Sequence, residues 1–208
     1  MSQDKAFWDR IARKYAQDPI ADQTSYEHKL EKTRAHFTPG SRVLEYGCGT
    51  GSTAILHAPH VREIVATDLS DEMIAIARER AAEAGVNNIR FEATDVADLH
   101  EPDESFDVVL ALNVLHLVPD RQAAMRLSRD LLKPGGVFIT STACLGDGMA
   151  FLALIKPVMR LFRAWPDFQI FKETRLAEEL RASGFEIEYR FKPAKTPVVF
   201  LIARKTAA

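Results

Sequence analysis

The chain has 208 residues, 47% of them hydrophobic, which suffices for one sizeable core in a single domain. Its 27 Lys and Arg residues nearly balance 29 Asp and Glu residues, so the net charge of -2 creates no general attraction for nucleic acid or anionic membranes. Cys48 and Cys144 lie far apart and lack the spacing of a zinc site. No window reaches the roughly 18 uninterrupted apolar residues of a membrane span. We therefore expect a cytoplasmic protein without a disulfide framework, a metal or a nucleic acid partner.

Residues 1–40 form the first predicted unit, a cap of helices. Apolar side chains recur there at helical spacing, on one stripe: Phe7, Trp8, Ile11, Ala12 and Tyr15. Packing on the core is the more common role of such a stripe, and contact with a ligand is the alternative.

Residues 41–145 alternate short apolar runs with longer amphipathic segments, a pattern typical of strands and helices around a parallel sheet. Strands are predicted at 42–46, 63–68, 89–93, 106–112 and 136–142. Helices are predicted at 51–58, 70–84 and 119–132. Gly85 is a plausible stop for the second helix, and the sequence KPGG at 133–136 reads as a helix stop and turn before the last strand. This order predicts a doubly wound, Rossmann-like core of the α/β class.

Two further units follow the core. Residues 146–172 are predicted to be a lid insertion with an apolar stretch at 149–165, and residues 173–208 to hold a helix at 174–183 and strands at 185–191 and 198–204. The short linker between these strands leaves no room for a parallel crossover, so they should pair antiparallel. We expect a seven-stranded sheet that is mostly parallel, with one antiparallel strand.

The sequence VLEYGCGTGSTA at 43–54 places Gly47, Gly49 and Gly51 between a strand and a helix. Bare backbone there lets a polar ligand approach closely. A dinucleotide fingerprint would require Gly or Ala where this chain has Ser52. Glu45 precedes the glycines and would repel a pyrophosphate but suit a cation, which indicates a positively charged ligand.

This pattern resembles the class I S-adenosylmethionine-dependent methyltransferases, whose first motif is an acidic residue followed by GxGxG at a strand-to-helix turn. The resemblance extends over ordered motifs at 43–140. It implies S-adenosylmethionine as cofactor and S-adenosylhomocysteine as product. The glycine loop would pass along the methionine and ribose portions, with Glu45 near the ammonium end.

The resemblance also assigns roles to residues after the next strands. Asp68 would hold the ribose hydroxyls, and Leu69 and Met73 would flank the adenine. Asp95 and Val96 would bind the adenine amino group and a ring nitrogen. Asn113 would help to hold the methionine portion, and an aromatic residue of the leading segment, Tyr15 or Tyr26, would touch the cofactor.

Each of these assignments has a structural alternative. The glycine loop can be a tight turn without a ligand. Asp68 can cap the next helix, although Ser70 can serve there too, and Asp95 can be an ordinary turn residue.

His116 is the candidate catalytic residue. Its context VLHLV resembles the ILHDW of plant phenolic O-methyltransferases, and a base is needed only if the acceptor must lose a proton. The alternative for His116 is packing and hydrogen bonding without catalysis.

The favoured function is therefore methyl transfer by in-line displacement to a small, apolar acceptor. The chain lacks the D/N-P-P-Y/F signature of amino methylation of nucleic acid bases or glutamine. The alternatives are a lipid or quinone-head-group methyltransferase at a membrane surface, a protein that binds S-adenosylmethionine without catalysis, and an oxidoreductase. The membrane alternative depends on Lys156, Arg160 and Arg163, which share one helical face, but membrane contact is not favoured. The acceptor atom and the oligomeric state stay open.

Overall fold

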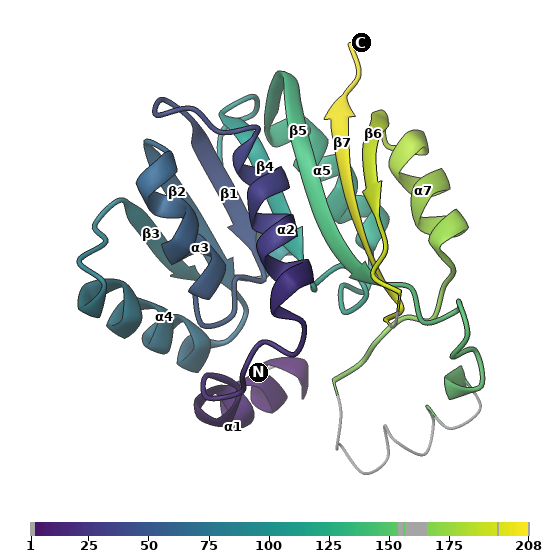
Figure 1. Cartoon of the computed structure of the whole chain (residues 1–208), viewed down its shortest axis with the longest axis horizontal. Coiled ribbons are helices and arrows are strands. Elements are labelled where there is room, and N and C mark those ends of the chain that lie inside the picture. Colours follow the sequence, from purple (N-terminus) through teal and green to yellow (C-terminus); the bar gives the residue numbers. More distant parts are fainter. Residues whose placement is uncertain (1–2, 154–155, 157–165, 195, 208) are drawn as a thin grey trace.

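A seven-stranded sheet forms the centre of the protein. The computed structural model describes residues 3–153, 156, 166–194 and 196–207, and its strands lie in the order β3-β2-β1-β4-β5-β7-β6 (Figure 1). Neighbouring strands from β1 to β5 are parallel, while β7 runs antiparallel to β5 and β6. This confirms the predicted doubly wound sheet with one antiparallel strand.

The strand bounds follow the apolar runs of the sequence. They are β1 (Arg42–Tyr46), β2 (Glu63–Asp68), β3 (Ile89–Ala93), β4 (Phe106–Leu112), β5 (Leu132–Ala143), β6 (Phe185–Phe191) and β7 (Val198–Lys205). Strands β1, β2 and β4 are almost fully buried, and such strands read as continuous apolar runs. The predicted bounds of β1 to β4 and β6 are confirmed.

The start of β5 was predicted wrongly. The preceding helix ends at Leu131, and Leu132 already has extended dihedral angles and pairs with Phe106. The next regular pair is Val108 with Val137, so residues 133–136 bulge out of the ladder. Gly135, at φ +73°, supplies the left-handed conformation that this bulge requires. The sequence KPGG is therefore an irregularity inside the strand, not a turn before it.

Several helices begin at a residue whose side chain caps them, whereas others begin without a side-chain cap. Ser70 Oγ accepts from Met73 N (3.1 Å) at the start of α4, and Asp120 Oδ1 accepts from Ala123 N (2.9 Å) at the start of α5. Gly85 follows α4 at φ +67°, as a C-terminal stop requires. The helices are α1 (Gln3–Tyr15), α2 (Gln23–Arg34), α3 (Ser52–His57), α4 (Asp71–Glu83), α5 (Arg121–Leu131) and α7 (Glu173–Ala182), with 3₁₀ turns η1 (Ala58–His60) and η2 (Val96–Asp98).

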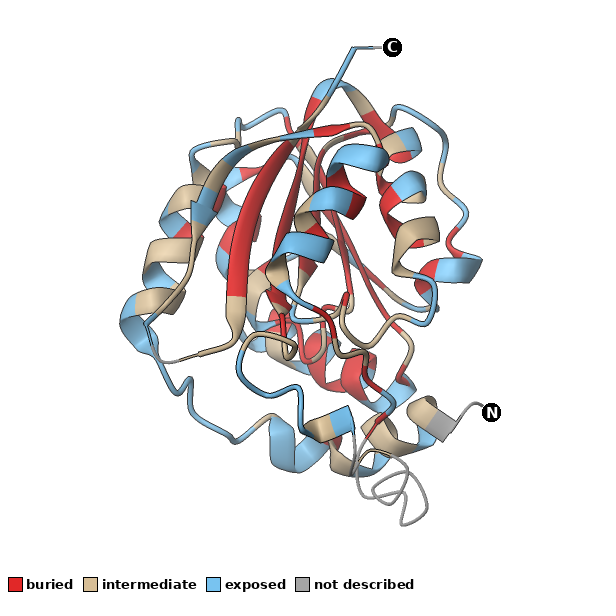
Figure 2. Ribbon diagram, turned by 90° about the vertical axis from the view of Figure 1, so that its right-hand side faces the viewer, coloured by how far each residue is buried: buried red, intermediate tan, exposed pale blue. Residues whose placement is uncertain are grey.

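Helices cover both faces of the sheet. Buried side chains of α5 and α7 join those of one face in a core cluster, and buried side chains of α3 and α4 join those of the other. Helix α2 lies over the second face, where His28 Nε2 bonds to Tyr189 Oη of β6 (2.7 Å). Figure 2 shows burial concentrated in the strands and exposure on the outer helix surfaces. The result is a three-layer α/β unit.

The predicted insertion at 146–172 has its two ends held together. Gly146 N donates to Phe171 O (2.8 Å), and Lys156 Nζ pairs with Asp167 Oδ1 (2.8 Å). Lys156 is thus not a free surface cation. Arg160 and Arg163 lie outside the described residues. Within the described ranges, no helix is long and apolar enough to cross a membrane.

Candidate active site

A cavity of about 310 Å³ opens at the carboxyl ends of β1, β2 and β4. The strand order reverses direction between β1 and β4, and ligands of open α/β sheets bind at such switch points. Helix α1 lies below this edge of the sheet in Figure 1 and contributes part of the wall. The topology therefore places the glycine loop and the residues after β2, β3 and β4 around one space.

Every second residue of the glycine loop has a left-handed backbone conformation. Gly47, Gly49 and Gly51 have φ values of +68°, +54° and +74°, which side-chain-bearing residues rarely adopt. The loop is closed by Gly51 N donating to Cys48 O (3.1 Å) and tied to β2 by Cys48 N donating to Thr67 O (2.9 Å). Its exposed backbone thus faces the cavity in a fixed shape.

The three glycines serve different steric needs. A Cβ at Gly47 would lie 2.5 Å from Val114 Cγ2, and one at Gly51 would lie 2.8 Å from Ala77 Cβ, so these two positions allow close packing. A Cβ at Gly49 would meet only Tyr15, at 3.8 Å. Gly47 and Gly49 line the cavity, whereas Gly51 does not. Contact of Gly51 with the ligand therefore stays a prediction, and close packing on Ala77 is a second reason for a glycine there.

Asp68 joins the loop to the end of β2. Its Oδ2 accepts from Gly49 N (2.9 Å) and its Oδ1 accepts from Ser70 N (3.0 Å). The side chain of Ser70, not that of Asp68, caps α4. Asp68 lines the cavity, and burial raises the pKa of its carboxyl, with a smaller contribution from Asp9 and Asp95. Its remaining acceptor capacity faces the ligand space.

Glu45 is the most unusual group of the cavity wall. The residue is 2% exposed, and its Oε2 has no hydrogen-bond partner among the described residues. Burial raises the pKa of this carboxyl to about 8. A buried carboxyl without a partner has a strong need for a donor or a cation.

The charge around the cavity has one sign. Among the described residues that line it, the charged side chains are all acidic: Asp4, Glu45, Asp68, Asp95 and Asp167. Such a wall suits a cationic ligand or one rich in hydroxyl and amino donors, and opposes a phosphate.

The predicted apolar neighbours lie in the same cavity. Leu69, Met73 and Val96 line it, and Met73 is 1% exposed. Asp95 also lines it while its Oδ1 accepts from Ala97 N (3.0 Å) at the start of η2. Asp95 thus both stabilises the turn that begins η2 and lines the cavity.

Helix α1 both packs on the core and lines the cavity. Ala12 is buried against Met73 and Ile76 of α4, while Trp8 and Tyr15 line the cavity with their rings edge to face at 6.1 Å. Asp9 Oδ1 accepts from Ser70 Oγ (2.6 Å), which holds α1 at the start of α4. Trp8 and Asp4 were not predicted as site residues. The apolar stripe at 7–15 includes Trp8, but such a stripe more often indicates packing on the core than contact with a ligand.

Asn113 follows β4 and lines the cavity at φ +59°. Its N–H donates to Ser141 O (2.6 Å), and its Oδ1 accepts from Ser141 Oγ (3.3 Å). A non-glycine residue in this conformation is uncommon and is held by these two bonds.

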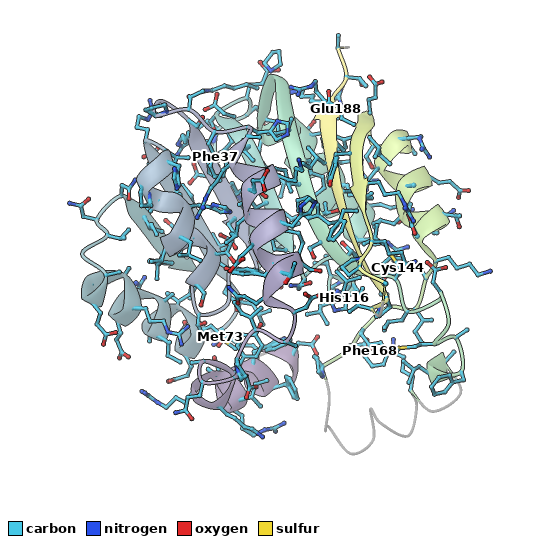
Figure 3. The ribbon with its side chains drawn as sticks, in the orientation of Figure 1. Phe37, Met73, His116, Cys144, Phe168 and Glu188 are labelled. Atoms are coloured by element: carbon cyan, nitrogen blue, oxygen red, sulfur yellow. The ribbon has the colours of Figure 1, made fainter. Side chains whose placement is uncertain are left out.

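Tyr26 and His116 are not among the residues that line the cavity. Tyr26 Oη bonds to Oγ1 of Thr53, which does line it (3.1 Å). His116 lies near the lower edge of the sheet in Figure 3, with Nδ1 lacking a partner among the described residues. Burial lowers the pKa of its imidazole to about 4. His116 is therefore neutral near pH 7. Its neighbours in the sequence, Val114, Leu117 and Val118, line the cavity instead.

Another part of the cavity wall is largely apolar, and sequence reasoning did not single out its residues after β4 or at the end of the insertion. It is formed by the loop after β4 and by the return of the insertion, together with Trp8: Val114, Leu117, Val118, Pro119 and Pro166. These residues carry no motif, and only the fold brings them together.

Comparison with known proteins agrees with this architecture. Residues 37–186 match a family described as a methyltransferase domain. The ubiquinone biosynthesis O-methyltransferase of Xanthomonas axonopodis pv. citri is 34% identical over 168 residues, 77% of this chain and 69% of the relative. The uncharacterized methyltransferase YcgJ of Bacillus subtilis is 37% identical over 98 residues, 47% of this chain and 39% of the relative.

The crystal structure of YcgJ from Bacillus subtilis superposes with a TM-score of 0.72 at 19% identity, covering 88% of this chain and all of that chain. At this identity the superposition shows the fold. The family match covers most of the chain and includes the glycine loop and the strand ends around the cavity. The chain therefore belongs to the class I S-adenosylmethionine-dependent methyltransferases.

Proposed function

We propose that the cavity binds S-adenosylmethionine and that the protein transfers its methyl group to a small, apolar acceptor. The observation that carries the proposal is Glu45, a buried carboxyl without a partner among the described residues, beside a glycine loop in an acidic cavity. The cofactor is a cation with an ammonium group and two ribose hydroxyls, so it supplies the donors that this wall lacks.

The residues present fit this ligand. Asp68 would accept from the ribose hydroxyls, and Glu45 would meet the ammonium end. Leu69 and Met73 would flank the adenine. Asp95 and the N–H of Val96 would bind the adenine edge. These assignments follow the family motif, and all six residues line the cavity.

The remaining predicted contacts differ in support. Asn113 and Tyr15 both line the cavity. Asn113 would contact the methionine portion of the cofactor, and Tyr15 would cover the glycine loop. Tyr26 would act through Thr53 rather than directly.

For catalysis, the protein mainly has to position the two reactants and exclude water from them. When bound, the cofactor supplies a methyl group on a sulfonium centre, which is a good leaving group for in-line attack. Trp8, Leu117 and Val118 exclude water from the acceptor end and orient the attacking atom. No Lys or Arg is among the described residues that line the cavity, so the wall favours a neutral acceptor over a carboxylate or phosphate.

Two measurements test this proposal. Calorimetry should show one molecule of S-adenosylmethionine bound per chain, in preference to a nicotinamide dinucleotide. The methyl-labelled cofactor should then label catechol, a neutral aromatic diol, or a component of a metabolite extract. Preferential binding of the dinucleotide would support an oxidoreductase, and tight cofactor binding without any transfer would support a non-catalytic binding protein.

A quinone head group is the second candidate acceptor. The relative from Xanthomonas carries the name ubiquinone biosynthesis O-methyltransferase. Met149 and Phe151, 40% and 60% exposed, also place apolar surface at the start of the insertion. Salt-sensitive association with anionic vesicles, lost on charge reversal of Lys156, Arg160 and Arg163, would favour this acceptor at a membrane. We expect weak or absent vesicle binding.

A further inference from the structure

Residues 166–171, the return of the insertion, lie against the loop that follows β4, and Gln169 makes the contact. Its backbone N–H donates to His116 O (2.7 Å). Its side-chain Nε2 donates to Val118 O (2.7 Å) and Pro119 O (2.6 Å). One residue thus satisfies three carbonyls of the loop at 116–119.

The orientation of the Gln169 amide is fixed from the other side. Arg121 donates to its Oε1, and Arg121 is itself held by both carboxylate oxygens of Glu179, at 2.6 and 2.9 Å. The guanidinium also lies over the ring of Phe171, at 3.9 Å from its centroid. Because a guanidinium can only donate, the amide oxygen must face it and the NH₂ group must face the loop carbonyls.

The loop that Gln169 holds is a wall of the cavity. Leu117, Val118 and Pro119 line it, whereas Gln169 does not. Within the loop, Leu117 N donates to Val114 O (2.8 Å), which forms a turn but offers nothing to the carbonyls at 118 and 119. The position of this wall therefore depends on donors from Gln169.

The cofactor residues are held by other contacts. Asp68 bonds to the backbone of Gly49 and Ser70, and the loop at 47–51 is tied to β2. Among the described residues, the hydrogen bonds of Gln169 go to His116, Val118, Pro119 and Arg121, and none reaches the cofactor residues. A change at Gln169 should consequently affect one end of the cavity and spare the other.

We propose that Gln169 is a positioning residue for the methyl acceptor. By bonding to the carbonyls at 116, 118 and 119, it holds the apolar wall against which the acceptor packs, and Arg121 keeps its amide in the required orientation. The role of this wall in acceptor binding rests on the proposed function.

The test compares Gln169→Leu with Gln122→Leu in the full chain. Gln122 Nε2 donates to Glu179 Oε1 (3.1 Å) in the same polar network but makes no bond to the loop, so it is a matched control. Three quantities are measured in both variants: the Kd of S-adenosylhomocysteine, the deuterium exchange of residues 114–120, and the KM and kcat for catechol.

Gln169→Leu should accelerate exchange in the loop and raise the KM for catechol by about tenfold or more, with a smaller change in kcat. Its Kd for S-adenosylhomocysteine should stay within about twofold of the unmodified protein, and Gln122→Leu should change none of these quantities by more than that. Loop exchange and KM unchanged in Gln169→Leu, or a Kd that rises as much as the KM, would overturn the inference.

The outcomes separate this inference from the proposed function. Absence of S-adenosylhomocysteine binding in the unmodified protein would refute the proposed function and, with it, the acceptor role. If the unmodified protein binds S-adenosylhomocysteine but does not methylate catechol, exchange in the loop and the Kd decide alone whether Gln169 holds the wall.

Discussion

The end of the cavity that we propose for the cofactor is built from three successive strand ends, whereas the end proposed for the acceptor combines segments far apart in the chain. Glu45 and Asp68 lie at the ends of β1 and β2, and Gly49 and Asp95 follow β1 and β3. Asp68 and Asp95 accept from nearby backbone N–H groups, whereas Glu45 Oε2 has no partner among the described residues. The acceptor end joins α1, the loop after β4 and the return of the insertion. Local geometry thus fixes one end and tertiary contacts such as those of Gln169 fix the other, so substitutions should separate the two.

The largest effect is expected for Gly49→Val. A valine at φ +54° is strained, and its side chain would stand between the loop and Tyr15, where the ligand approaches. We expect cofactor affinity to fall by about 100-fold or more, because the loop can neither keep its shape nor accept the ligand. Calorimetry with S-adenosylhomocysteine measures the loss.

Gly85→Val is the matched control for backbone strain. Gly85 has φ +67° and no atom within 4 Å of an added Cβ, and it lies after α4, outside the cavity wall. The free energy of unfolding of Gly85→Val should fall by a similar amount, roughly 1–2 kcal/mol, while its cofactor affinity stays unchanged. Equal affinity in the two variants would show that the glycine loop is only a turn.

The next effect is expected for Asp68→Asn. The amide keeps an oxygen for one backbone N–H but loses the charge that would strengthen bonds from two ribose hydroxyls. Binding should weaken by about 1.5–3 kcal/mol. Asp95→Asn should cost less, about 0.5–1.5 kcal/mol, because Asp95 is exposed. Calorimetric titration of both variants with S-adenosylhomocysteine in the same buffer measures the two losses of affinity. A larger loss in Asp95→Asn than in Asp68→Asn would contradict the assignment of the ribose to Asp68.

Glu45 makes the stability of the unliganded protein depend on pH. Its folded pKa of about 8 lies above the ordinary 4.5, so the folded state keeps a proton that the unfolded state has lost. Stability from this group is therefore complete below about pH 4.5 and decreases as pH rises to 8, by on the order of a few kcal/mol.

Glu45→Gln should remove this decrease and weaken cofactor binding by about 1–2 kcal/mol. Urea denaturation of both proteins between about pH 5 and pH 8 measures the change in the free energy of unfolding. Parallel pH profiles would mean that Glu45 is ionised throughout in the folded protein.

The smallest effect is expected for His116→Ala. Since the pKa of this imidazole is already lowered to about 4 and its ring does not line the cavity, it is poorly placed as a base at neutral pH. Turnover should fall by less than the roughly 10²- to 10⁴-fold typical of a lost general base. A loss within that range, with intact cofactor affinity and a vanished ionisation in the kcat profile, would instead establish His116 as the base.

The fold around the proposed cofactor end could be predicted from the sequence because its determinants are local. Buried parallel strands read as apolar runs, and the motif residues follow them at fixed positions, as Glu45 and Asp68 illustrate. Sequence reasoning misplaced the start of β5 because a bulge at 133–136 has the composition of a turn. The contact of Gly51 with the ligand stays a prediction, and the close approach of Ala77 is a second reason for that glycine.

The individual residues of the proposed acceptor end could not be predicted for a different physical reason. Leu117, Val118 and Pro166 have no distinctive chemistry, and they acquire a function only where the loop after β4 meets the end of the insertion. Gln169 is an ordinary glutamine in the sequence, and its importance follows from three carbonyls that lie within its reach.

A crystal structure of the protein with S-adenosylhomocysteine would show how the ligand lies in the cavity. We expect the ribose hydroxyls on Asp68, the amino acid portion along Gly47 and Gly49 near Glu45, and the sulfur directed toward the wall at 117–119. A ligand bound in the reverse direction, or outside the cavity, would contradict the division into a cofactor end and an acceptor end.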